Sequence, residues 1–139
     1  MTIESDIVDL QHRYDAEAIE AESATEADFA VLDRFLDALE AGEIRAAEKR
    51  DGDWSAVEWV KQGILLNFAL RQAEPRTYGE VTYHDVLPLR ETDDLMEKGT
   101  RNTPDGTVVR RGAYVGSDAI LMSPSFVNIG AHVGDGTLV

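Results

Sequence analysis

The feature that most constrains this chain is a strict six-residue period that starts at Val109 and runs to the last residue. Aliphatic side chains recur at every sixth position, and a small residue follows four positions after each of the first five. The aliphatic positions are Val109, Val115, Leu121, Val127, Val133 and Val139; the small ones are Ala113, Ala119, Ser125, Ala131 and Thr137. This period fits neither an α-helix, with about 3.6 residues per turn, nor an alternating strand.

A triangular solenoid accounts for the period. Each hexad supplies one short side and one corner, so three hexads complete a coil and the aliphatic side chains stack inside it. We therefore predict that Val109 lies under Val127, and that the next two inward positions stack in the same way (Val115 under Val133, Leu121 under Val139). The small residues fit the tight corners. The pattern is typical of a left-handed parallel β-helix built from hexapeptide repeats.

One difficulty follows from the length of the repeat. Residues 109–139 make fewer than two coils, whereas a solenoid needs about three repeat units to bury its faces. The sequence also stops on an inward aliphatic residue, Val139. We therefore expect the chain to be a truncated piece of a longer protein, and inactive by itself.

Upstream of the repeat the pattern is helical. Apolar residues at spacings of three and four predict a first helix within residues 1–22. Thr25 and Asp28 form a capping-box-like start for a second helix, which Gly42 is placed to end. A third helix is predicted to begin at Ser55, with a buried face made by Val57, Val60, Ile64, Leu65 and Phe68.

Between the last two helices, Asp51-Gly52-Asp53 predicts a turn in a small hairpin. The tryptophans Trp54 and Trp59 are predicted to pack in the helical core. Residues 72–107 are poorly patterned and read as a connector with short strands, including an extended run from Asp85 to Leu89. The predicted fold class is thus α+β, with a helical N-terminal domain (1–71), a connector (72–107) and the start of the β-helix (108–139).

Composition narrows the class of protein further. The net charge is −14, which repels phosphate backbones and anionic lipids, so nucleic acid and membranes are poor partners. Residues 1–58 hold 17 Asp and Glu against 5 Lys and Arg, so most of this charge lies in the N-terminal part. The chain has no cysteine, no secretory signal and no apolar run of membrane-spanning length. We expect a cytoplasmic protein.

Two segments resemble one enzyme family. Val109 to Val139 (VRRGAYVGSDAILMSPSFVNIGAHVGDGTLV) and Leu36 to Leu70, which contains the LLNF run, are similar to the tetrahydrodipicolinate N-succinyltransferases, whereas residues 1–35 and 72–98 match weakly or not at all. The resemblance implies a homotrimer that transfers succinyl from succinyl-CoA to the amine of ring-opened tetrahydrodipicolinate, in lysine and diaminopimelate biosynthesis. Succinyl-CoA is then a co-substrate, and no cofactor is bound permanently.

Acyl transfer to an amine needs a base, donors for the oxyanion, and fixed substrate carboxylates, which arginine holds best. The resemblance implies that Arg101 binds the dicarboxylate, because Arg101 to Pro104 and Val109 to Ala113 match the family's R-x-x-P and V-R-x-G-A patterns, with one extra residue between them. A surface arginine near a turn is the alternative. Arg110 and Arg111 are weaker candidates, since corner arginines are usually solvated.

The family's catalytic groups lie beyond the GTLV run, so no catalytic residue is assigned here, and the residues that bind coenzyme A are unknown. His132 is a weak candidate base, because the family has an aromatic residue at that position. The three histidines lack the spacing of metal ligands, so no metal site is predicted.

Two alternatives stay open. One is a related tetrahydrodipicolinate N-acetyltransferase, which competition between acyl donors would distinguish. The other is a non-catalytic module that docks onto intact β-helix subunits, which size-exclusion chromatography with a full-length partner would test.

Overall fold

The computed structural model describes all residues from 1 to 139 and separates into two compact units. Unit 1 comprises Met1–Phe35 with Ala46–Pro88, and unit 2 comprises Leu36–Arg45 with Leu89–Val139. The mixture of helices and short strands confirms the α+β class. In chain order the elements are α1 (Ile3–Asp15), α2 (Glu26–Glu40), β1 (Ala47–Arg50), β2 (Asp53–Ala56), α3 (Glu58–Leu70), β3 (Glu74–Tyr78), β4 (Val81–Asp85), α4 (Asp93–Glu97), β5 (Arg101–Asn102), β6 (Thr107–Val109), β7 (Tyr114–Val115), β8 (Ile120–Leu121), β9 (Ser125–Val127) and β10 (His132–Val133).

The first two helices begin where side chains cap them. In α2 the predicted capping box is confirmed, because the Thr25 amide donates to Asp28 Oδ2 at 2.9 Å and the Asp28 amide donates to Thr25 Oγ1 at 3.3 Å. The predicted first helix is also confirmed as α1, and it starts from a capping box of Thr2 and Ser5 that the sequence analysis did not identify.

The third helix differs from its prediction in start and in buried face. Ser55 lies in β2, and α3 begins at Glu58 without a side-chain cap. The predicted core residues Leu65 and Phe68 are 57% and 38% exposed. Val60 is buried as predicted, and the helix also buries Gly63, Leu66, Asn67 and Leu70.

Gly63 explains this choice of face. A Cβ at Gly63 would lie 2.6 Å from the ring of Phe35, so only a glycine allows the two helices to approach this closely. Trp59 packs edge-to-face on the same ring, with centroids 6.2 Å apart, as predicted for a core tryptophan. The prediction for Trp54 is wrong, because this side chain lies on β2 and is 61% exposed.

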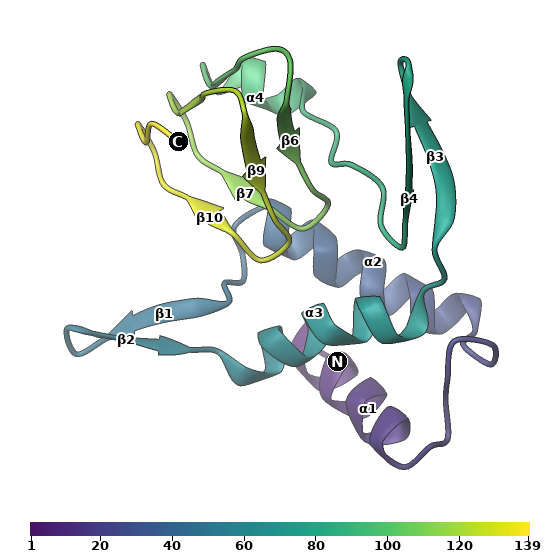
Figure 1. Cartoon of the computed structure of the whole chain (residues 1–139). Coiled ribbons are helices and arrows are strands. Elements are labelled where there is room, and N and C mark those ends of the chain that lie inside the picture. Colours follow the sequence, from purple (N-terminus) through teal and green to yellow (C-terminus); the bar gives the residue numbers. More distant parts are fainter. The chain divides into compact units, whose positions relative to one another are not determined.

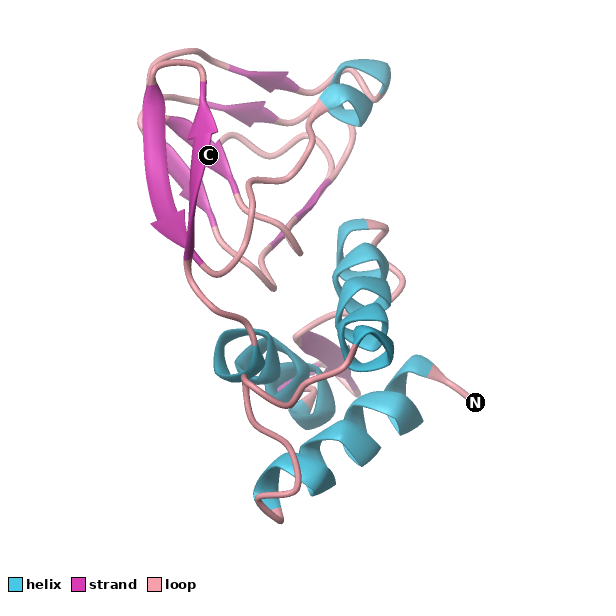
Figure 2. Cartoon of the chain, turned by 90° about the vertical axis from the view of Figure 1, so that its right-hand side faces the viewer, coloured by secondary structure: helices cyan, strands magenta, loops and turns pink.

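Unit 1 also carries two antiparallel hairpins. β1 and β2 pair across Asp51 and Gly52, both in the left-handed region, which confirms the predicted turn. The strands β3 and β4 run side by side as the longest arrows in the fold (Figure 1, Figure 2). They replace the extended run predicted from Asp85 to Leu89, of which only the first residue belongs to a strand.

α2 ends at Glu40, and Gly42 follows it with φ +74°, as predicted for a glycine that terminates the helix. The Glu43 amide donates to Ala38 O and the Gly42 amide to Leu39 O, which together satisfy the last carbonyl groups of the helix. A Cβ at Gly42 would also lie 2.9 Å from the ring of Tyr114. Both the positive φ and this close contact therefore disfavour any residue larger than glycine at this position.

The repeat forms short strands that pair in parallel. β6 pairs in parallel with β9 and β7 with β10, and these strands lie beside each other in Figure 1. The register joins Val109 to Val127 and Val115 to Val133, 18 positions apart, which confirms the first two predicted stacks. An isolated parallel bridge between Ile120 and Leu138 has the same offset.

The interior of these coils is apolar, and the corners hold small residues. Ala113 and Ala119 are fully buried, in one cluster with the inward aliphatic side chains. Leu95 of α4 joins this cluster with no exposed surface, so the short helix packs against the apolar interior of the repeat. Thr100 fastens the next segment, because its hydroxyl donates to Gly116 O at 2.6 Å and accepts from the Ala119 amide.

Candidate functional site

Arg101, the predicted substrate-binding residue, lies in β5 at the start of the coils. Its amide donates to Ala119 O at 3.0 Å, and its register partner is Ile120 of β8. The side chain is exposed, and the structure gives its guanidinium neither an ion pair nor a hydrogen bond within the chain. Arg101 is thus anchored by its backbone, with a guanidinium that is available to an anion.

The extra residue noted in the sequence lies directly after this strand. Arg101 and Ile120 are 19 positions apart, whereas the pairs that follow are 18 apart. The surplus residue falls in the turn 103–106, where Asp105 and Gly106 have φ values of +64° and +116°. The turn therefore absorbs the insertion, and the repeat keeps its register on both sides.

Three hydroxyl groups hold this turn in place. Ser123 Oγ lies 2.8 Å from Thr103 Oγ1 and 2.9 Å from Thr107 Oγ1. The Ser123 amide donates to Thr103 Oγ1, and the Ser123 hydroxyl is in contact with the carbonyl of Pro104. The network ties both ends of the turn to the coil above, which limits the movement of Arg101.

The two weaker arginine candidates have partners inside the chain. Arg111 bridges Asp37 at 2.7 Å and Glu40 at 2.6 Å, and Glu40 also accepts from the Gly112 amide. Burial alone would lower the pKa of Arg111, but hydrogen bonds to these two carboxylates outweigh it and raise that pKa. Arg111 therefore fastens the end of α2 to the coils.

Arg110 donates to Asn128 Oδ1 at 3.2 Å across one coil step. Its side chain has a further interaction within the chain, as does that of Arg45. Among the arginines of unit 2, Arg101 is consequently the one without an internal side-chain partner. This structural difference supports the choice of Arg101, whose role in binding stays a prediction.

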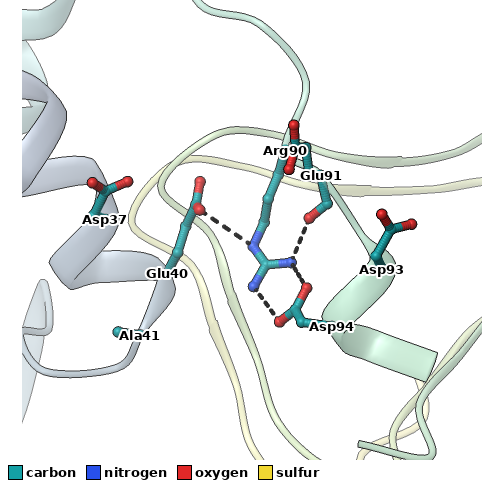
Figure 3. A pocket seen from close by; sticks show the side chains of 7 residues that line it. All are labelled: Asp37, Glu40, Ala41, Arg90, Glu91, Asp93 and Asp94. Atoms are coloured by element: carbon teal, nitrogen blue, oxygen red, sulfur yellow. Dashed lines mark hydrogen bonds and ion pairs between the residues drawn. The ribbon is translucent and has the colours of Figure 1, made fainter. Parts of the chain in front are cut away.

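A pocket of about 350 Å³ opens between the end of α2 and the start of α4 (Figure 3). Arg90, whose side chain is 4% exposed, lies between Glu40 and Asp94 and forms two hydrogen bonds of 2.8 and 2.9 Å with Asp94. These hydrogen bonds lower the pKa of Asp94. The sequence analysis missed this cluster, although the spacing of four between Arg90 and Asp94 was a usable signal. We assign it a structural role, because its central cation forms ion pairs with two carboxylates, Glu40 at 3.8 Å and Asp94 at 2.8 Å.

His132 stacks on Tyr114 of the preceding coil, with ring centroids 4.1 Å apart. Burial and the positive charge of Arg45 lower its pKa, against the opposing effect of Asp135. The lowered pKa favours the neutral imidazole, whose ring stacks on that of Tyr114. His12 and His84 lie in α1 and β4 of unit 1, and no cluster of three potential metal ligands is present.

Comparisons with known proteins give the family. Residues 2–70 match the model of the tetrahydrodipicolinate N-succinyltransferase N-terminal domain. A 2,3,4,5-tetrahydropyridine-2,6-dicarboxylate N-succinyltransferase of Polynucleobacter asymbioticus is 42% identical over 114 residues, which cover 78% of this chain and 41% of the relative. The enzyme of the same name from Dechloromonas aromatica is 35% identical over 113 residues, covering 79% of this chain and 41% of the relative.

These matches place the chain beside relatives that are named as N-succinyltransferases. More narrowly, it belongs to the tetrahydrodipicolinate N-succinyltransferase family. The chain spans about 41% of the length of these relatives, so the larger part of each has no counterpart in it. None of the helices is long and apolar enough to cross a lipid bilayer.

Proposed function

We propose that the whole protein, to which residues 1–139 contribute, transfers the succinyl group of succinyl-CoA to the amine of ring-opened tetrahydrodipicolinate. The amine nitrogen forms a bond to the thioester carbonyl carbon, the carbon–sulfur bond breaks, and the amine proton leaves with the thiol. The observation that carries the proposal is the family match, since both relatives described above are named for this reaction. The cytoplasm is the expected compartment for this step.

The coils of unit 2 are, in this proposal, the first turns of a left-handed parallel β-helix. The 18-residue register of β6 with β9 and of β7 with β10 supports it, as do the buried inward aliphatic residues. Further hexads would stack on the edge formed by β9, β10 and the residues after β10; Phe126 in β9 is 60% exposed, and Leu138, which bridges to Ile120, is 68% exposed. The division into residues 1–71, 72–107 and 108–139 belongs to the same proposal.

Arg101 takes the role of binding one substrate carboxylate. A guanidinium offers two parallel N–H donors that match the two oxygens of a carboxylate, and the exposed Arg101 keeps these donors available. Its backbone hydrogen bond and the neighbouring hydroxyl network set its position in advance, which reduces the entropy lost on binding. The catalytic base and the coenzyme A groove are expected in the downstream part of the family's sequence, which has no counterpart in residues 1–139. The active unit is expected to be a homotrimer.

A hybrid protein tests the assignment. Residues 1–139 are joined to the matching downstream part of the Polynucleobacter asymbioticus relative, and thiol release is measured with succinyl-CoA and with acetyl-CoA. We expect activity with succinyl-CoA that Arg101→Gln lowers by at least about 100-fold, mainly through KM, because a charge-assisted pair to a carboxylate is lost. The matched control Arg50→Gln, on an exposed hairpin arginine, leaves the rate unchanged.

Two outcomes would contradict the proposal. A folded hybrid that releases no thiol from succinyl-CoA, under conditions in which the intact relative does, would mean that residues 1–139 do not replace the corresponding part of this enzyme. A hybrid whose activity is insensitive to Arg101→Gln would remove Arg101 from the substrate site.

A further inference from the structure

Unit 1 contains a pocket of about 420 Å³ whose wall is part apolar and part cationic. This volume is within the range of about 300–1,000 Å³ that is usual for small-molecule sites. The apolar part of the wall comes from Ala21, Phe29, Leu70 and Val86, and the cationic part from Arg71 and Arg76. These residues come from the segment after α1, from α2, from the end of α3, and from β3 and the segment after β4.

Arg71 is held firmly at this wall. Its side chain is 16% exposed, its Nε donates to Asn67 Oδ1 at 3.0 Å, and its Nη2 bridges Asp33. Its guanidinium carbon lies 5.7 Å from the centroid of the Phe29 ring, within the range of a cation–π contact. The remaining nitrogen, Nη1, has no hydrogen bond in the structure, so this fixed cation keeps donors for a ligand.

Arg76 is fixed in a similar way from β3. Its side chain is 21% exposed, Nη1 donates to the carbonyl of Asp85 at 2.6 Å, and Nη2 pairs with Glu74 at 2.7 Å. The third nitrogen, Nε, makes no hydrogen bond within the chain. Glu74, which is 65% exposed, is the one carboxylate in the pocket lining, and Asp33, which pairs with Arg71, lies outside that lining. Each arginine therefore has one solvated carboxylate partner and keeps at least one donor nitrogen for a ligand.

The two arginines of the pocket lining lie in an acidic part of the chain. The N-terminal part of the sequence is strongly acidic, and its solvated carboxylates favour cations over anions. Two half-buried arginines beside an apolar wall therefore select a ligand that meets both features at once: an anionic head for the guanidinium groups and a hydrocarbon body for Phe29 and Leu70.

We propose that this pocket binds a small organic acid, with its carboxylate against Arg71 and Arg76 and its apolar body against Phe29, Leu70 and Val86. A carboxylate suits the two remaining donor positions, one on each arginine, because its two oxygens accept hydrogen bonds in one plane. An inorganic phosphate would leave the apolar wall uncovered and is bound less tightly. The proposal does not depend on the transfer reaction, since every residue in it lies in unit 1.

The test is a titration of the complete ¹⁵N-labelled chain, followed through backbone amide and arginine Nε resonances. Benzoate and butyrate are the probes, with inorganic phosphate and chloride at equal ionic strength as controls. For ligands of this size we expect saturable shifts at the pocket residues with a Kd of about 1 mM or below.

Two variants and one matched control locate the site. Arg76→Gln removes one cation and is expected to raise the Kd at least about tenfold, the loss of one charge-assisted hydrogen bond. Ala21→Trp fills the pocket while it keeps both arginines, and abolishes saturable binding. Arg50→Gln is the control, because Arg50 pairs with a glutamate two positions earlier on a strand, just as Arg76 does, but lies outside the pocket.

Three results would overturn the proposal. The first is a chemical shift that rises linearly with the concentration of benzoate and of butyrate, without saturation. The second is phosphate binding as tight as benzoate binding. The third is an Arg50→Gln variant that weakens benzoate binding as much as Arg76→Gln does. If Arg76→Gln fails to fold by circular dichroism, unchanged benzoate binding in Ala21→Trp is the contradicting result.

Discussion

Truncation of Leu95 to alanine tests whether α4 closes the interior of the coils. Leu95 is fully buried in the cluster with Val109, Val115 and Leu121. The change removes three buried carbon groups, each worth about 0.8 kcal/mol, and so costs about 2.4 kcal/mol in transfer free energy. A remaining void of about 45 Å³ at about 24 cal/mol per Å³ adds about 1.1 kcal/mol, for a total of about 3.5 kcal/mol.

Native-state hydrogen exchange measures this loss of stability directly at amides of unit 2. The amides of Tyr114 and Gly116 donate to Ala131 O and Val133 O across one coil step, so they exchange only when the coils open. Since about 1.4 kcal/mol corresponds to a factor of ten, Leu95→Ala is expected to speed their exchange by about 300-fold. The control is Met96→Ala in the same helix, whose side chain is 73% exposed. A change below about tenfold in Leu95→Ala, or an equal change in both variants, would refute this role for α4.

Three further predictions concern local contacts. Gly42→Ala is expected to cost more than Gly52→Ala, by about 1–3 kcal/mol in urea unfolding, because both glycines have positive φ but only a Cβ at Gly42 meets an aromatic ring; equal costs would remove the close contact from the account. Arg111→Gln breaks two ion pairs at the end of α2 and lowers stability by about 1–3 kcal/mol in the same assay, whereas a loss too small to measure would make the pairs incidental. Burial opposes ionisation of Asp28, but hydrogen bonds from Arg13 and from Thr25 outweigh it and lower its pKa. A carboxyl with a lowered folded-state pKa stabilises the fold above its unfolded pKa, and this contribution is lost as the pH falls through the folded pKa. Asp28→Asn is therefore expected to flatten the decline in stability below about pH 4, and an unchanged pH profile would contradict it.

The repeat was predictable because its physics is local and periodic. Every inward position must be aliphatic, so the spacing of Val109 and Val127 in the sequence equals the length of one coil in the structure. The capping box of Thr25 and Asp28 and the glycine at position 42 were predictable for the same reason, since each satisfies backbone groups of its own helix.

The predictions that failed depend on distant partners. In α3 nearly every residue from Ile64 to Leu70 is apolar, so the pattern could not identify which face is buried. Contact between Gly63 and Phe35 makes that choice, and a glycine inside an apolar helix was the signal available for it. Ser55 and Trp54 were misplaced because the β1–β2 hairpin extends through them before the helix starts.

The candidate site was predicted only in part. The R-x-x-P pattern singled out Arg101, but the sequence could not show that the extra residue fits into the turn 103–106. The cluster around Arg90 and the pocket in unit 1 bring together residues far apart in sequence, so neither pattern nor spacing predicted them.

A disulfide between neighbouring coils tests the winding of the repeat most directly. The chain has no cysteine, so Val108→Cys with Phe126→Cys creates a single pair, and these positions are register partners on adjacent parallel strands. Adjacent strands lie about 4.8 Å apart, within the Cα separation that a disulfide allows. Mild oxidation is expected to link this pair rapidly within one chain and to leave the control pair, Val108→Cys with His132→Cys, unlinked. Efficient linkage of the control pair, or none in the paired positions of a folded chain, would contradict the 18-residue coil.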